Sequence, residues 1–189
     1  LDASTTLPRH FQDYSRTSPL HLGLSRGGRP KVLELLLKAG YAAGKAMPRL
    51  SDGRSPLLHL TKLADAQAAG HIASPERRVR LAKLLIAYGA DLDMADNKGW
   101  TPLHTAAEFG AVDLTSLLIE NGARLNLVDK KGLTALHWAA MCARVGGAEC
   151  IVALVAAGAD TSIATNKGVL AEHWAANDAV LLALQGKPL

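Results

Sequence analysis

The stretch that decides the fold is TPLHTAAEFG, residues 101–110, because nearly the same string returns as TALHWAAMCA at residues 134–143. The step of 33 residues between the two strings also maps Gly99 onto Gly132. A catalytic motif normally occurs once in a chain, whereas a string that recurs at a fixed step is typical of a structural repeat. The recurring string therefore indicates a structural repeat rather than a catalytic site.

Less complete copies lie on both sides of this pair. SPLHL at 18–22 and SPLLHL at 55–60 precede it, and NKGVLAEHWAA at 166–176 follows it. Residues 1–15 have no repeat character, and they form either a helical cap on the first unit or a free arm. We therefore expect a single domain over residues 1–189, with five units at about 16–52, 53–95, 96–128, 129–164 and 165–185.

The third unit predicts a turn, a helix, a second turn and a second helix. Asp-Asn-Lys-Gly at 96–99 favours a tight turn. Thr101 can cap a helix, Pro102 suits its first position, and Gly110 can end it in the left-handed region. Apolar residues at helical spacing predict a second helix over about 113–121. A single unit cannot bury its apolar stripes, so the units must stack against one another.

At these residues the chain resembles an ankyrin repeat protein. GWTPLHTAAEFGAVDLTSLLIENGARLN at 99–126 matches the repeat closely, GLTALHWAA at 132–140 nearly as well, and the resemblance covers roughly residues 16–185. It implies an all-α, right-handed solenoid of helix–turn–helix units. It also implies that the His of the motif is structural and hydrogen-bonds within its unit and to the neighbouring turn. The residues to which this structural motif carries over are His21, His104 and His137, together with Thr101, Pro102 and Thr134.

The resemblance further implies that the chain binds another protein, without catalysis and without a cofactor. In this family the turn tips and the exposed side of each first helix usually hold the partner. By position these are Asn97, Lys98, Trp100, Glu108 and Phe109 in the third unit, Lys130, Lys131, Leu133, Trp138 and Met141 in the fourth, and Asn166, Lys167 and Val169 in the fifth. We expect Trp100 and Phe109 to be exposed binding residues; alternatively, Trp100 packs flat on the next turn. Trp138 and Trp174 are expected to pack between units.

Insertions mark a second candidate surface. The second unit carries 13 more residues between its helices than the third, and residues 64–78 are either a binding loop or a tolerated surface insertion. Arg77 and Arg78 are candidate contacts there, unless they begin the second helix. A smaller extension lies at 143–149, and residues 41–53 predict an enlarged turn between the first two units.

Charge is distributed unevenly along the chain. Residues 1–90 hold 14 Lys and Arg against 6 Asp and Glu, whereas residues 91–189 hold 7 against 11. The asymmetry either complements a charged partner or aids solubility. It leaves a nucleic-acid-associated adaptor as an alternative, although the acidic half would repel a phosphate backbone and the basic half lacks interleaved aromatic residues.

Several chemistries have no signature in the sequence. There is no phosphate-binding loop, no zinc-ligand spacing and no nucleophile elbow, so we expect neither an enzyme nor a small-molecule substrate. No apolar run reaches the length of a membrane span, and the compartment stays open because the sequence does not begin with Met. Cys150 should be a buried small hydrophobe, and a bridge to Cys142 is the less favoured alternative.

The sequence therefore predicts a non-catalytic protein-binding module, monomeric before it binds, that uses its concave face, the insert at 64–78, or both. High Ala, Arg and Leu content and a short array point weakly to a bacterial source. For such a source, a sharper hypothesis is an inhibitor or immunity protein that blocks a cognate toxin or effector. The alternative is an adaptor or scaffold region of a larger protein.

Overall fold

The computed structural model of the protein describes residues 18–25, 29–41, 52–63, 74–141, 146–175, 181–182 and 184–185. Its regular elements in these ranges are α1 (Pro19–Ser25), α2 (Pro30–Lys38), α3 (Pro56–Lys62), α4 (Pro75–Ala87), α5 (Pro102–Glu108), α6 (Val112–Glu120), α7 (Ala135–Met141), α8 (Gly147–Ala156) and the 3-10 helix η3 (Ala171–Trp174). These ranges hold no strand, and the predicted all-α repeat fold is confirmed.

Parts of several predictions fall outside the described residues. They are the arm or cap at 1–15, most of the insert at 64–78, the segment 42–51 of the enlarged turn, residues 143–145 of the fourth-unit extension, and Cys142.

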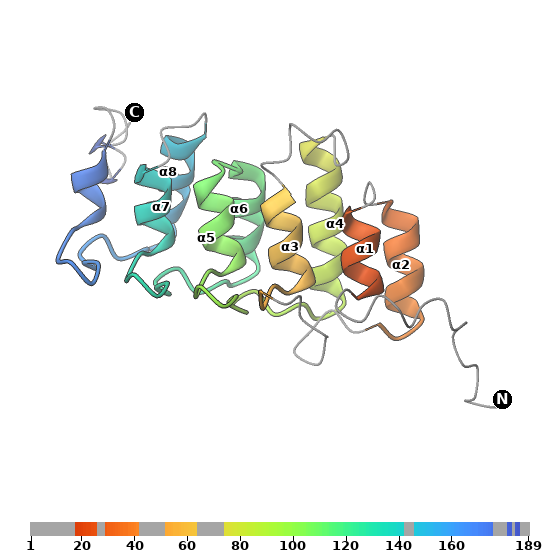
Figure 1. Ribbon diagram of the computed structural model, residues 1–189. Helices are drawn as coiled ribbons and strands as arrows, with labels where there is room; N and C mark the ends of the chain where they lie inside the picture. The colour runs from red at the N-terminus through yellow and green to blue at the C-terminus, as the bar shows by residue number, and fades with distance from the viewer. Residues whose placement is uncertain are drawn as a thin grey trace.

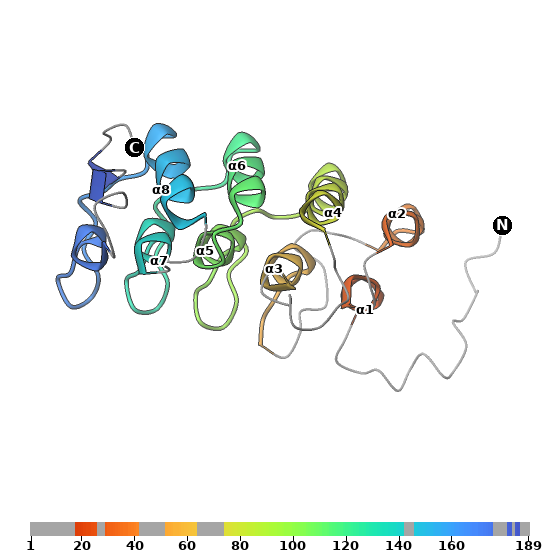
Figure 2. The same cartoon turned by 90° about the horizontal axis from the view of Figure 1, so that it is seen from above.

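The helices form two rows that run from one end of the molecule to the other (Figures 1 and 2). In the first row α1 packs on α3, α3 on α5, α5 on α7, and α7 on η3. In the second row α2 packs on α4, α4 on α6, and α6 on α8. Each helix therefore contacts the equivalent helix of the adjacent unit, which is the architecture of a solenoid.

Helices α1, α3, α4 and α5 begin where serine or threonine precedes proline. Ser55 and Thr101 have extended backbones and accept hydrogen bonds from the N–H groups three residues on, at 3.2 Å from Leu58 and 3.4 Å from His104. Pro56 and Pro102 follow at the first helical position, where a missing N–H has no cost. The local sequence thus sets the starts of α3 and α5.

The core is built from leucine and alanine. Ala106, Ala107, Ala139 and Ala140 in α5 and α7 are fully buried, and their small side chains let neighbouring backbones approach closely. Cys150 in α8 belongs to the same core as a free thiol, and burial raises its pKa to about 11. Cys150 therefore acts as a small hydrophobe, as expected.

Buried histidines join successive units. His104 Nδ1 accepts the Thr101 backbone N–H at 3.1 Å, so Nε2 carries the proton and donates it to the Leu133 carbonyl of the next unit at 3.0 Å. His137 makes the same pair of bonds, with Thr134 N–H at 3.1 Å and with the Val169 carbonyl at 3.3 Å. The arrangement requires a neutral imidazole, since a proton on Nδ1 would face another donor.

The first and second units are joined in the same way, and the second and third are not. His21 Nε2 lies 3.1 Å from the Arg54 carbonyl, but Leu58 occupies the equivalent position in the second unit. There the Thr61 and Thr105 hydroxyl groups lie 2.5 Å apart instead. The junction between the second and third units therefore uses different polar contacts.

In the described part of the chain, burial lowers the pKa of four imidazoles, those of His21, His59, His104 and His137. The pKa of His59 falls to about 4, because burial and the positive field of nearby groups disfavour its charged form. Its ring meets that of His21 edge to face, with centroids 5.4 Å apart. Protonation of either ring would place a charge at the first junction.

We expect His104→Leu to lower the free energy of unfolding by about 2–3 kcal/mol, because the buried Thr101 N–H loses its acceptor and the Leu133 carbonyl loses a donor. Leucine fits the helix at this position, as Leu58 shows in the second unit. Urea unfolding followed by circular dichroism measures the change. A loss below about 0.5 kcal/mol would show that the bond does not hold the units together.

We also expect stability to fall with pH below the ordinary histidine pKa. Unfolded imidazoles bind protons near pH 6.5, whereas the folded ones resist protonation, so the contribution of His59 is complete above that value and is lost as pH falls toward about 4. Its full loss is roughly 3 kcal/mol. Urea unfolding at about pH 7.5 and about pH 5 should show the decrease. His59→Gln should flatten the dependence of the unfolding free energy on pH, whereas the same substitution at the exposed His173 should not. If the two variants show the same pH dependence, His59 is not its source.

Candidate partner-binding surface

Short turns place the candidate binding residues. In the third unit Asp96 Oδ1 accepts the N–H groups of Lys98 at 2.8 Å and Trp100 at 3.0 Å. Asp129 makes the matching bonds in the fourth unit, and the Thr165 hydroxyl makes longer ones in the fifth. A polar side chain at the start of each turn therefore fixes the shape of its tip.

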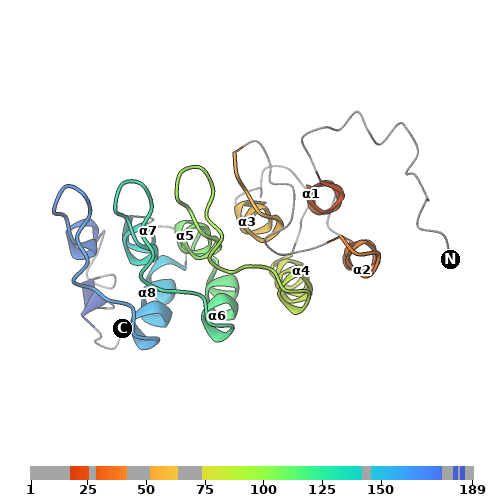
Figure 3. The same cartoon turned by 90° about the horizontal axis from the view of Figure 1, so that it is seen from below.

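Each turn tip is tied to the next through the backbone. Lys130 N–H donates to the Lys98 carbonyl, and Asn166 N–H donates to the Lys131 carbonyl, both at 3.1 Å. The tips project past the row of α5 and α7, on the side away from α6 and α8 (Figures 2 and 3). We call the tips at 96–100, 129–133 and 165–169, with the adjoining sides of α5, α7 and η3, the turn-side surface.

A cation lies behind the tip of the third unit. Lys62 Nζ is 2.8 Å from Asp96 Oδ2 and 5.2 Å from the centre of the Trp100 ring. Burial alone would raise the pKa of Asp96, but the hydrogen bonds from Lys62 and from two backbone N–H groups outweigh it, and the pKa is lowered. Asp96 thus stays ionised, and Lys62 joins α3 to the tip of the third unit.

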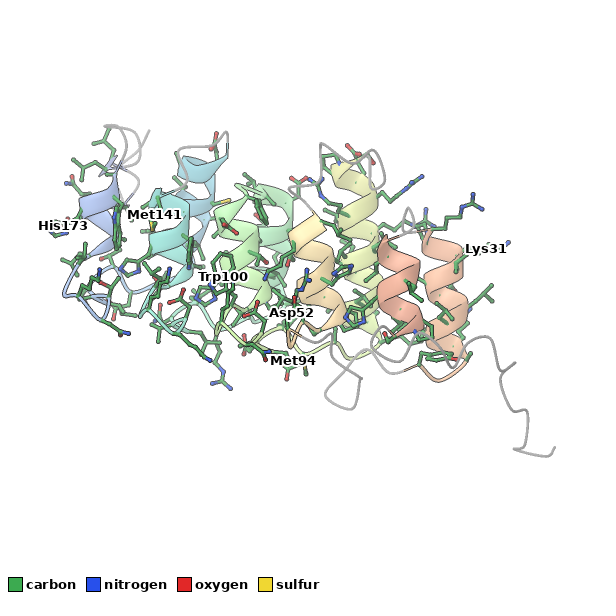
Figure 4. All side chains as sticks on the ribbon, in the orientation of Figure 1. Lys31, Asp52, Met94, Trp100, Met141 and His173 are labelled. Carbon is green, nitrogen blue, oxygen red and sulfur yellow. The ribbon has the colours of Figure 1, made fainter. Side chains whose placement is uncertain are left out.

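The expectation that Trp100 and Phe109 are exposed is wrong, since both are half-buried. Trp100 contacts Trp138 of the fourth unit, with ring centres 4.3 Å apart and planes inclined by 56°, and Figure 4 shows it near the turns. Phe109 ends α5, where its N–H donates to the Thr105 carbonyl. Trp138 therefore packs between units, as expected.

Leu133 was also predicted to lie exposed on a turn tip, and this prediction is wrong. Only 5% of it is accessible, because its N–H donates to Asp129 and its carbonyl accepts both from Asp129 N–H and from His104. The structural residues Thr101, Pro102 and Thr134 are buried at the first-row helix starts.

The remaining predicted contacts divide between two places. Asn97 and Lys98 are exposed on the third tip, and Glu108 is half-buried near the end of α5. Arg77 and Arg78, in contrast, belong to the first turn of α4 in the second row. The structure therefore does not bring the two arginines together with the turn-side residues.

A groove of about 470 Å³ opens between α7 and η3. Its lining residues are Lys130, Lys131, Leu133, Trp138, Met141, Thr165, Asn166, Lys167, Val169 and Trp174. The structure thus gathers the predicted fourth- and fifth-unit residues in one depression, and Met141, 43% exposed, is visible on α7 in Figure 4. Thr165 and Trp174 were not predicted to line a site; the signal for Trp174 was its alignment with Trp138.

Among the described residues no three His, Cys, Asp or Glu side chains lie close enough to hold a metal ion. None of the described helices is long and apolar enough to cross a membrane.

Comparison with known proteins places this geometry in context. A family model for ankyrin repeats, in three copies, matches residues 70–165, which is just over half of the chain. The chain is also similar to protein phosphatase 1 regulatory subunit 12A of Mus musculus, with 39% identity over 55 residues, or 28% of this chain and 5% of the relative. It is 46% identical over 46 residues to protein phosphatase 1 regulatory subunit 27 of Homo sapiens, or 24% of this chain and 30% of the relative.

The turn tips make a pair of glycine substitutions informative. Gly132 and Gly168 both have positive φ, but a Cβ on Gly132 would lie 2.6 Å from the Asn166 backbone nitrogen, whereas one on Gly168 meets nothing within 4 Å. We expect Gly168→Ala to cost about 1–2 kcal/mol through backbone strain alone. Gly132→Ala should cost at least about 1 kcal/mol more, because the tips must separate. If urea unfolding shows that both variants lose the same free energy of unfolding, the two neighbouring turn tips are not closely packed.

Proposed function

The chain belongs to the ankyrin repeat family, and we propose that it is a non-catalytic interaction module that binds another protein through the turn-side surface of its third to fifth units. The observation that carries the proposal is the groove between α7 and η3, which is lined by lysines from two turn tips and by apolar side chains that include the exposed Met141. Apolar anchors with charged groups at their edge are typical of protein-binding surfaces.

The way the surface is built supports binding without rearrangement. The tips are fixed by side-chain hydrogen bonds within each turn and by backbone hydrogen bonds between turns. Little conformational freedom is then lost when a partner binds, so more of the contact energy contributes to affinity.

The relatives favour an adaptor role. Their names describe regulatory subunits of protein phosphatase 1, and this chain spans less than a third of either one's length. We propose that this chain likewise holds a protein in place, as an adaptor or scaffold region. A narrower form of the same proposal is an inhibitor or immunity protein whose turn-side surface masks a toxin or effector.

A second candidate, a polyanion-binding adaptor, is favoured by one observation. The packed helices α2 and α4, with Arg29 directly before α2, present exposed basic side chains. They are Arg29, Lys31, Lys38, Arg77, Arg80 and Lys83, of which Lys38 is ion-paired with Glu34. Binding of nucleic acid there should weaken steeply as salt rises between about 50 and 200 mM, whereas protein binding at the turn-side surface should change much less.

Affinity capture with matched variants tests the primary proposal. The immobilised chain is incubated with lysate of the organism that encodes it, and retained proteins are quantified by mass spectrometry. Met141→Glu with Lys131→Glu changes the turn-side surface, and Val152→Glu with Lys83→Glu makes the same charge change on exposed residues of the second row. We expect a partner retained by the native chain and by the second-row variant to be reduced at least about tenfold by the turn-side variant.

If every retained protein is insensitive to the turn-side substitutions, the proposed surface is wrong. If retention is lost instead with the second-row variant, the partner binds the helices of that row.

A further inference from the structure

The floor of the groove is apolar and comes from two units. Met141 and Trp138 belong to α7, Trp174 to η3 and Val169 to the fifth tip. Trp138 is held against Trp100, and Trp174 meets the His137 ring edge to face at 5.5 Å. The floor is therefore fixed in shape, and its volume of about 470 Å³ suits a large apolar side chain and its neighbours.

The rim of the groove is positively charged. Lys130 and Lys131 of the fourth tip and Lys167 of the fifth are exposed lining residues. No carboxylate lines the groove, and no carboxylate of the described residues forms an ion pair with these three lysines. Asp129, beneath the fourth tip, is buried and accepts two backbone N–H groups. The cationic rim thus has no partner within this part of the protein.

We propose that the groove binds an extended acidic segment of a protein partner, with one large apolar side chain on the floor and carboxylates beside the lysines of the two tips. The inference rests on the proposed function and names the chemistry of the partner. Carboxylates would meet the positive rim, and the anchor would cover the exposed surface of Met141 and Val169.

The same lysines and tryptophans raise the alternative of a single-stranded nucleic acid, which needs open aromatic faces for its bases. Here Trp138 is packed on Trp100 and Trp174 on His137. Met141 and Val169 contribute aliphatic surface rather than a stacking platform. The geometry therefore favours a peptide with an aliphatic or aromatic anchor.

Nuclear magnetic resonance of the ¹⁵N-labelled full chain tests this inference without knowledge of the partner. The probe is a short synthetic peptide with a leucine between two pairs of glutamates. One control peptide replaces the leucine with alanine, and another replaces the glutamates with lysines. We expect the first peptide to shift the indole N–H signals of Trp138 and Trp174 and the amides of Lys131 and Lys167 in a saturable way. The controls should shift them much less.

Charge-matched variants locate the binding. Lys130→Glu with Lys167→Glu should lower the affinity for the acidic peptide by about tenfold. Lys31→Glu with Lys83→Glu makes the same change on the second-row helices and should leave its affinity unaltered. All four side chains are exposed, so the fold should tolerate both pairs, and circular dichroism checks this.

Other outcomes overturn the inference. Absence of saturable shifts at the groove signals would do so, as would equal binding of the lysine peptide or equal weakening by both pairs of substitutions. If an oligothymidylate shifts the same signals and binds more tightly than the peptide, the groove is a nucleic-acid site. If capture depends on the turn-side surface while the acidic peptide does not bind, the proposed function stands and this inference fails.

Discussion

The structure depends on a hydrogen bond from a buried histidine of the first, third or fourth unit to the unit that follows it. A neutral imidazole at the start of a first-row helix donates a hydrogen bond from its Nε2–H to a carbonyl just before the next unit's helix, as His104 does to Leu133. This bond joins adjacent units and ends on the last residue of the next turn tip. Because the carbonyl belongs to the turn, the same bond that stabilises the stack also places the candidate binding residues.

The junction that lacks this bond differs in a way that bears on function. With Leu58 in place of a histidine, the second and third units are joined on this side by Thr61, Lys62 and the Asn97 N–H, which donates to the Asp52 carbonyl. Lys62 lies over Trp100 and bonds to Asp96, so these side chains are committed to the junction. The third tip therefore holds less free apolar surface than its sequence suggests, and the open groove lies further along, between α7 and η3.

The parts of the fold that could be predicted from sequence are those set by local chemistry. A capping hydroxyl followed by proline marks a helix start regardless of the rest of the chain, and the recurring string showed that the units stack. Burial of Trp100 and Leu133 could not be predicted in this way. The two residues hold the same place in successive turns, yet one packs on a tryptophan of the next unit and the other lies beneath its own tip. Such differences, like the groove itself, arise from side chains of two units that meet only after stacking.

The charge of the binding surface depends on where the charged side chains lie in the fold and not on the composition of that half of the chain. The second half of the chain is acidic. Some of its carboxylates are buried in the turns, as Asp96 and Asp129 are, and others lie on second-row helices, as Asp113 and Glu149 do, or on first-row helices, as Glu108 and Glu172 do. The described lysines of the same half, Lys98, Lys130, Lys131 and Lys167, are exposed on the turn tips. Fields of exposed charges are screened within about 10 Å at moderate salt, so the groove responds to its own lysines more than to distant carboxylates. An acidic half can therefore present a basic binding surface, provided that the fold uses its carboxylates as turn acceptors.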